Sequence, residues 1–194
     1  FFLLKNDLAI DYYIRAISIY SKSEPKSNIA LAYYSLGKCY LKKNNIPYAE
    51  SYFEKATIVY EKLNFLEAIE VINLQKAIIK KEKRKYEEAI TILKGVIENI
   101  SDDALLSTKT EAYIQLGEIE VIKKEYSQAL DYLNQAKYTN ETSNNDFKLA
   151  KRIYKLLGTT HEKNNNISSS NFYLQKYVNL VDSIGKLNNS NLTE

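Results

Sequence analysis

The sequence predicts an all-α fold, a solenoid of antiparallel helix pairs with about nine helices. Apolar residues recur at steps of three and four along most of the chain, which is the spacing of one helix face. The 194 residues include only five glycines and two prolines, so few positions interrupt a helix. A pattern of small and aromatic residues also recurs at a period of 40 residues, and such periods indicate stacked repeat units.

The clearest repeat unit is YYSLGKCYLKKNNIPYAESYFEKA, residues 33–56. Its first half predicts one helix, and the Asn and Pro residues of 42–47 predict the turn to a second. A glycine inside a helix costs about 1 kcal/mol relative to alanine. Gly37 is therefore expected to let a neighbouring helix approach closely.

Copies of the second-helix pattern begin at Ala9, Ala49, Ala89, Ala129 and, less clearly, Ser170. With this register we expect helices at residues 7–22, 26–43, 47–63, 65–83, 86–100, 103–123, 126–140, 146–163 and 167–184. The repeat array is expected to span residues 1–184, and the polar segment 185–194 to be a disordered tail or linker.

The chain begins with FFLL and contains no methionine, so we expect its natural start to lie upstream. The register places residues 1–4 at the end of a truncated first helix. Four apolar side chains without cover would contact another molecule or fray, so this end is a candidate surface for self-association.

Charge and hydropathy exclude several classes of protein. The net charge is +3, from 27 basic and 24 acidic residues, which does not indicate a nucleic-acid surface. No apolar run approaches the roughly 20 residues that span a bilayer, so no membrane contact is expected in this segment. The compartment stays open between the cytoplasm and, for a part of a membrane-bound sensor, the periplasm.

Catalytic residues are not indicated either. His161 is the only histidine and falls at a predicted packing position, and Cys39 lies beside Gly37 on a predicted buried turn. No zinc-ligand spacing, phosphate-binding glycine loop or catalytic triad is visible. The sequence therefore predicts a protein that is not an enzyme and needs no cofactor. The basic run at residues 80–85 is interpreted as a solvated turn, with contact to nucleic acid or an anionic surface as the alternative.

The repeat unit resembles the tetratricopeptide (TPR) family in its order of aromatic, Leu-Gly, aromatic, and then alanine, aromatic, alanine. The residues that carry this resemblance are Tyr33, Leu36, Gly37, Tyr40, Ala49, Phe53 and Ala56. The period of 40 departs from the family's usual period of about 34. Similar long-period arrays are found in bacterial signalling proteins. The resemblance implies a right-handed superhelix that binds a protein or peptide on its concave face, which the first helix of each pair lines.

Carrying the family's concave positions onto this sequence implies a partner-binding surface that includes Leu31, Tyr34, Lys38, Leu41, Val71, Leu74, Ile78, Ile114, Val121, Arg152 and Lys155. In this interpretation Tyr34, Leu74 and Ile114 form an apolar ladder, while Lys38, Arg152 and Lys155 engage acidic groups of a ligand. Tyr34 and Lys38 replace the lysine and asparagine of the family's carboxylate clamp, so docking of chaperone tails is not expected.

The helix expected at 65–83 allows two interpretations. Its packing positions are polar, whereas its concave positions Val71, Leu74 and Ile78 are apolar. Either the helix is rotated or shifted by one residue, so that Leu74, Ala77 and Ile78 pack in the core, or it presents an apolar strip to a ligand.

The sequence thus predicts a non-catalytic binding module. The first hypothesis is the sensing or coupling array of a bacterial signalling protein, and the second is a plain scaffold that assembles proteins without switching. An enzyme or nucleic-acid binder is the third.

Overall fold

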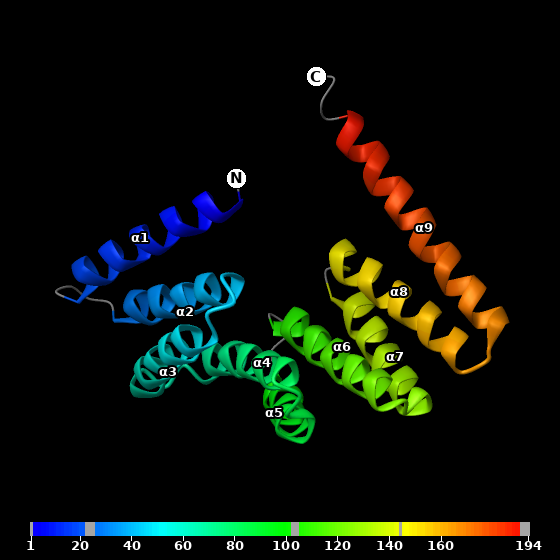
Figure 1. The fold of residues 1–194 in the computed structure, drawn as a ribbon, viewed down its shortest axis with the longest axis horizontal. Coiled ribbons are helices and arrows are strands. Elements are labelled where there is room, and N and C mark those ends of the chain that lie inside the picture. The colour runs from blue at the N-terminus through cyan, green and yellow to red at the C-terminus, as the bar shows by residue number, and fades with distance from the viewer. Residues whose placement is uncertain (1, 22–25, 102–104, 144, 191–194) are drawn as a thin grey trace. The chain divides into compact units, whose positions relative to one another are not determined.

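The computed structural model describes residues 2–21, 26–101, 105–143 and 145–190, with side chains from residue 6 to residue 185. All regular secondary structure in these ranges is helical, which confirms the predicted all-α fold (Figure 1). The chain forms two compact units, residues 1–85 and 86–194, and each is described by itself. The single array over residues 1–184 stays a prediction.

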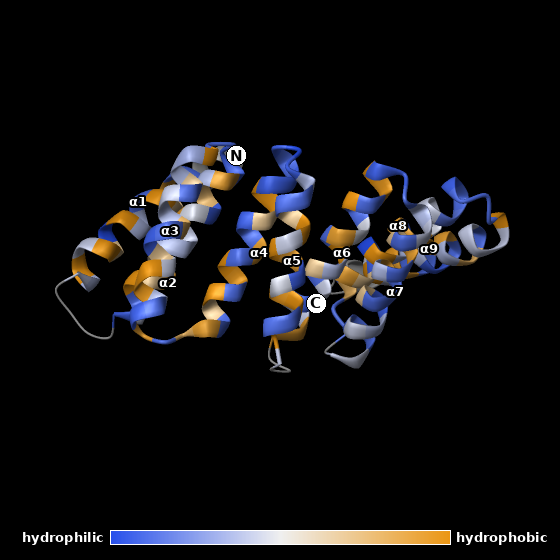
Figure 2. Ribbon diagram, turned by 90° about the horizontal axis from the view of Figure 1, so that it is seen from below, coloured by the Kyte–Doolittle hydropathy of each residue, from blue (hydrophilic) through white to orange (hydrophobic). Residues whose placement is uncertain are grey.

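Nine helices lie in the described ranges, as predicted. The first unit contains α1 (Phe2–Tyr20), α2 (Ser27–Lys42), α3 (Ile46–Lys62) and α4 (Leu66–Glu82). The second contains α5 (Tyr86–Asn99), α6 (Leu106–Lys123), α7 (Tyr126–Thr142), α8 (Phe147–Lys163) and α9 (Ile167–Ser190). Apolar and polar residues alternate along the helices (Figure 2), as their amphipathic spacing requires. The seven helices from α2 to α8 begin and end within three residues of their expected bounds.

The first helix differs from the prediction. Residues 2–4 belong to α1 itself and do not end a separate, truncated helix. No glycine or proline near Asn6 interrupts the helix, and the Asn6 side chain donates a hydrogen bond to the Cys39 carbonyl of α2, 2.9 Å away. The predicted exposure of the apolar side chains at 1–4 lies outside the described residues.

The last helix is longer than predicted. α9 continues beyond residue 184 to Ser190, so six residues of the expected tail are helical. This segment contains no proline, and its one glycine, Gly185, costs about 1 kcal/mol, which does not end a helix by itself. Polar composition alone was therefore a poor guide to the boundary.

Most turns between the helices share one backbone form. A residue one or two positions after the helix has a positive φ at Asn44, Asn64, Arg84, Lys124 and Asn165. At each of these turns the next residue donates its N–H to the carbonyl five residues earlier, at 2.9 Å. This pairing closes the helix end and satisfies a carbonyl that would otherwise have no partner. Within each unit this shared turn reverses the chain direction between successive helices.

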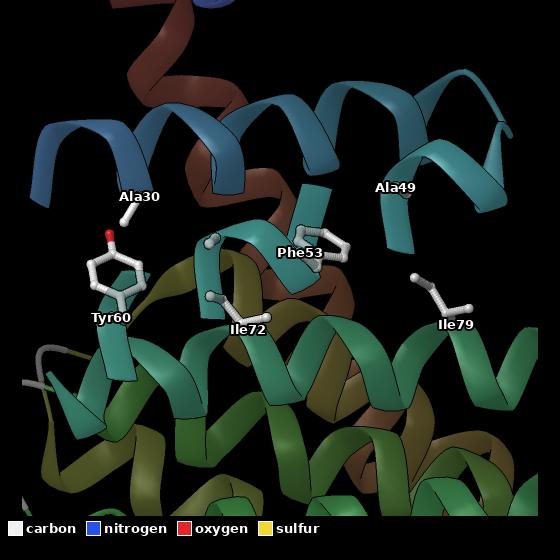
Figure 3. Close-up of a cluster of buried hydrophobic side chains, with 7 residues drawn as sticks. Ala30, Ala49, Phe53, Tyr60, Ile72 and Ile79 are labelled. Atoms are coloured by element: carbon white, nitrogen blue, oxygen red, sulfur yellow. The ribbon is translucent and has the colours of Figure 1, made fainter. Parts of the chain in front are cut away.

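In the first unit, α2, α3 and α4 meet around a buried cluster, shown in Figure 3. Phe53 of α3 lies at its centre and is fully buried. Gly37 of α2 faces this ring: a Cβ atom at position 37 would lie 2.5 Å from Phe53 Cε1. The predicted role of Gly37 in close helix approach is confirmed. A second cluster, with Ile10, Leu36 and Cys39 at its centre, joins α1 to α2.

The second unit repeats this design. Ile114 of α6 packs with Leu133 of α7 and with Ile153 and Leu157 of α8. A Cβ atom at Gly117 would lie 2.8 Å from Leu133 Cγ, and one at Gly158 would lie 2.7 Å from Leu174. Gly37, Gly117 and Gly158 thus each lie where a large side chain of the paired helix packs against the glycine.

The packing of α4 supports the core interpretation, and not the apolar strip for a ligand, for most of that helix. Ile72 and Ile79 fill the cluster around Phe53, each one residue before an expected packing position. Leu74 and Ala77 are also buried, as the core interpretation requires. The polar residue Lys76 reaches the edge of α3 instead, where its ammonium lies 3.3 Å from Glu54 and 3.2 Å from the Thr57 hydroxyl.

Candidate partner-binding surface

Arg152 lies at the centre of a hydrogen-bonded cluster on the predicted concave positions. It projects from α8 toward α6, which packs beside it in the second unit. Its Nη1 lies 2.6 Å from Glu111 and its Nη2 lies 2.6 Å from Glu118, while Nε donates to Glu118 at 3.1 Å. Gln115 donates to Glu111 at 2.6 Å. The three α6 residues lie at steps of four and three, so they face α8 together.

This cluster bears on the predicted role of Arg152. Burial lowers the pKa of Arg152, but the carboxylates of Glu111 and Glu118 outweigh that effect and hold the pKa above its ordinary value. The guanidinium therefore pairs within its own chain, and its contact with a ligand's acidic groups stays a prediction. The two carboxylates exceed the one guanidinium by a single negative charge.

The exposed side of α8 carries a row of lysines. Lys148, Lys151 and Lys155 are all exposed, and their spacing of three and four places them on one helix face. None of the three has a salt bridge in the described part of the chain. The Asp146 carboxylate caps the start of this helix through the Lys148 and Leu149 amides, at 2.7 and 3.2 Å. Of the predicted surface residues on α8, Lys155 is thus the free cation.

Two residues of the predicted apolar ladder are not accessible. Leu74 is 5% exposed and Ile114 is fully buried within the core of the second unit. They fill space between helices, so the ladder of Tyr34, Leu74 and Ile114 is a wrong prediction. Val121 of α6 is half-buried, and Ile122 beside it is exposed.

In the first unit, the predicted residues of α2 differ in accessibility. Leu31 is exposed and lines a cavity of about 140 Å³ together with Tyr13 and Tyr20 of α1. Tyr34 is half-buried, with its ring centre 5.9 Å from that of Phe53. Burial is the main cause that raises the pKa of Tyr34, and the neighbouring Tyr60 raises it further. Lys38 is exposed, and its ammonium lies 5.3 Å from the centre of the Tyr34 ring, within cation–π range.

Three further predicted residues of this unit are half-buried. Leu41 packs against the Phe53 cluster, while Val71 and Ile78 flank the buried positions of α4. The basic run at residues 80–85 begins in the last turn of α4 and continues into the exposed turn that follows. Within it Lys83 pairs with Glu50 at 2.7 Å.

The two residues considered for catalysis serve packing. Burial raises the pKa of Cys39, which favours the unreactive thiol. His161 stacks on Tyr173, with the ring centres 5.6 Å apart and the planes within 4°, and burial lowers its pKa. No group of three or more metal-ligating side chains occurs within the described ranges.

The paired helices, their glycine contacts and their repeated turns agree with a comparison to known families. The sequence model of the soluble NSF attachment protein (SNAP) family matches residues 3–115, more than half of the 194 residues. The chain belongs to the soluble NSF attachment protein family. SNAP family membership places it among the TPR-like helical-repeat proteins, which is the coarser form of the resemblance seen in the sequence.

Solved structures give the same fold. BtubC (BKLC) from P. vanneervenii superposes with a TM-score of 0.77 at 14% identity, over 93% of this chain and 75% of that one. At this identity the similarity concerns the fold alone. No curated protein sequence matches this SNAP-family chain. None of its described helices combines the length and apolarity needed to cross a bilayer.

The sequence analysis placed Arg152 on the concave face but did not identify Glu111 and Glu118 as its partners. The signal was present, because opposite charges occupy concave positions of successive repeats. Comparing charges between neighbouring repeats, and not only within one helix, would have found the cluster. The lysine row was missed because Lys148 and Lys151 lie outside the family's concave positions.

Proposed function

We propose that this SNAP-family chain is a non-catalytic scaffold that binds an acidic segment of another protein. The observation that carries the proposal is the row of Lys148, Lys151 and Lys155 on α8, three exposed ammonium groups on one face without internal partners. Unpaired charge of one sign on a rigid helix attracts and orients a partner of opposite charge.

The cluster beside this row supports the proposal. Glu111 and Glu118 hold Arg152 against α6, so the backbone of α8 that carries the lysines is tied to its neighbour. A partner would then meet a preorganised surface, which lowers the cost of binding. The half-buried Val121 and exposed Ile122 of α6 offer apolar surface in the same unit.

The name of the family, soluble NSF attachment protein, supports the scaffold role. A plain scaffold needs no switch, and we propose this form of the function. The sensing or coupling role in a bacterial signalling protein stays a prediction, and no specific feature of the helices favours it.

Binding of synthetic helical peptides tests the proposal. A labelled amphipathic peptide of leucine and glutamate should bind the chain, and a leucine and lysine peptide of equal length should not. The triple variant Lys148→Glu, Lys151→Glu and Lys155→Glu should bind the acidic peptide at least about tenfold more weakly, because three attractions become repulsions. Fluorescence anisotropy over a range of salt concentrations measures both effects.

The matched control replaces Lys42, Lys62 and Lys94 with glutamate. These are three exposed lysines on other helices. The control changes the net charge of the chain by the same amount, so it separates the α8 face from bulk charge. Equal losses of affinity in the two triple variants, or equal binding of the acidic and basic peptides, would contradict the proposed surface.

A further inference from the structure

The outer face of α1 carries an apolar row that no described part of the chain covers. α1 packs on α2 through its inner face, where Ile10 is buried and Tyr13 and Ile17 are partly buried. On the opposite face Leu8, Tyr12 and Ile19 are 56%, 66% and 65% exposed. Three large apolar side chains at this exposure on one helix face indicate a contact surface.

The spacing of this row is that of a coiled coil. Leu8, Tyr12, Arg15 and Ile19 follow one another at steps of four, three and four, which is the repeat of the a and d positions in a two-helix seam. A row that merely faced solvent would not need large apolar residues at three of its four positions.

The exposed side of α9 is mixed in composition. Gln175, Asn179 and Asp182 are exposed, and Gln175 donates to Asn179 at 2.9 Å. Phe172 and Val178 are also 55% and 45% exposed, but they lie six residues apart and do not follow the steps of a seam. The regular spacing of its apolar row therefore distinguishes α1 from α9.

We propose that α1 pairs with α1 of a second copy of this chain in antiparallel orientation. This inference does not depend on the proposed function, since it concerns a different surface. In the antiparallel register Leu8 lies opposite Ile19 of the second copy, and Tyr12 lies opposite its Arg15. The same register then holds for all four seam positions, which makes the face self-complementary as a twofold interface requires.

Charge selects the antiparallel orientation. Arg15 and Asp11 form an exposed ion pair within α1, with the atoms 2.9 Å apart. Antiparallel pairing brings Asp11 of each copy to the level of Arg15 of the other, and sets each guanidinium beside a tyrosine ring. Parallel pairing would instead bring the two Arg15 side chains together. The pairing is weak, because three apolar side chains per copy bury less surface than a standard interface.

Sedimentation velocity across the micromolar to millimolar range tests the pairing. The 194-residue chain should move from its monomer mass of 22.4 kDa toward twice that value as the concentration rises. Tyr12→Glu or Ile19→Lys should raise the dissociation constant at least about tenfold by placing charge in the seam. Tyr138→Glu on α7, at a side chain that is 65% exposed, is the control and should leave it unchanged.

A charge exchange locates the contact. Asp11→Arg and Arg15→Asp should each weaken self-association, and a mixture of the two variants should pair, because each supplies the charge that the other lacks. Circular dichroism should show equal helix content in all the variants, since every changed residue is exposed. A chain that stays at 22.4 kDa at every concentration overturns the proposal. So does a dimer that persists in Tyr12→Glu, or a mixture that fails to pair.

Discussion

The contact between Gly37 and Phe53 offers a sharp test of how the repeat packs. Replacing Gly37 by alanine would place a carbon 2.5 Å from Phe53 Cε1 and 2.6 Å from Cδ1. Carbon atoms in ordinary contact lie about 3.5 to 4.0 Å apart, so the ring would have to move by about 1 Å. The ring is fully buried and lies against Tyr34, which leaves it little room.

Two opposing effects set the size of the change. Alanine in place of a helical glycine stabilises a helix by about 1 kcal/mol. Overpacking a well-filled core typically costs about 1–3 kcal/mol. Because the obstacle is a rigid, buried ring, we expect the upper part of that range, and a net loss of about 2 kcal/mol for Gly37→Ala. Urea denaturation followed by circular dichroism measures it.

Gly95 of α5 is the matched control, since a Cβ atom there would meet nothing within 4 Å. Gly95→Ala should therefore raise the free energy of unfolding by about 1 kcal/mol. In a Phe53→Leu background the obstructing ring is gone, so Gly37→Ala should become neutral or stabilising. If Gly37→Ala stabilises the unchanged chain as much as Gly95→Ala does, the close approach of α2 and α3 does not explain the glycine.

Three further predictions follow from individual side chains. Arg152→Gln leaves Glu111 and Glu118 without their cation, so the free energy of unfolding measured in urea should fall by about 1–2 kcal/mol, and an unchanged value would refute this. Lys124→Gly relieves a positive φ of 67° and should raise urea stability by about 0.5–1 kcal/mol, while an unchanged or lower value would contradict the strain. Burial lowers the pKa of His161, so the unfolded chain binds its proton more readily, and stability should fall as the pH drops below the ordinary value of 6.5. His161→Phe keeps the stacking on Tyr173 and should flatten that pH dependence; a slope equal to that of the unchanged chain would exclude His161 as its source.

The fold could be predicted from the sequence because its determinants are local and repeated. Alternation at three and four residues fixes each helix, and the glycine facing a large side chain fixes how two helices meet. Those signals lie within 20 residues of one another and recur, so one clear copy was enough to locate the others. The error at α1 has the same origin, because a boundary was carried over from distant copies although no residue near Asn6 interrupts the helix.

The candidate surface was less predictable, since side chains compete for the same space. On α4, the packing positions of the repeat fall on Asn73 and Lys80, so carrying the repeat pattern over would bury these two residues and expose Ile72 and Ile79. Burying an isoleucine stabilises the fold by about 1.5–3 kcal/mol. The helix therefore packs with its isoleucines inward, and Asn73 and Lys80 turn away from the core. The pairing of Arg152 was missed for a related reason, because its two carboxylate partners lie on a neighbouring helix far away in the sequence.

The repeat also extends to polar residues that the core does not require. Lys43, Lys83 and Lys123 follow the first helices at intervals of 40 residues, and each pairs with an acid on the helix before it: Asp7 at 2.6 Å, Glu50 at 2.7 Å and Glu87 at 3.1 Å. Each lysine lies at a helix C-terminus, where a positive charge is favoured. Solvent screens exposed pairs of this kind, so they add little to stability. Their recurrence indicates that they align neighbouring helices. The apolar contacts alone would leave the ends of the helices free to slide.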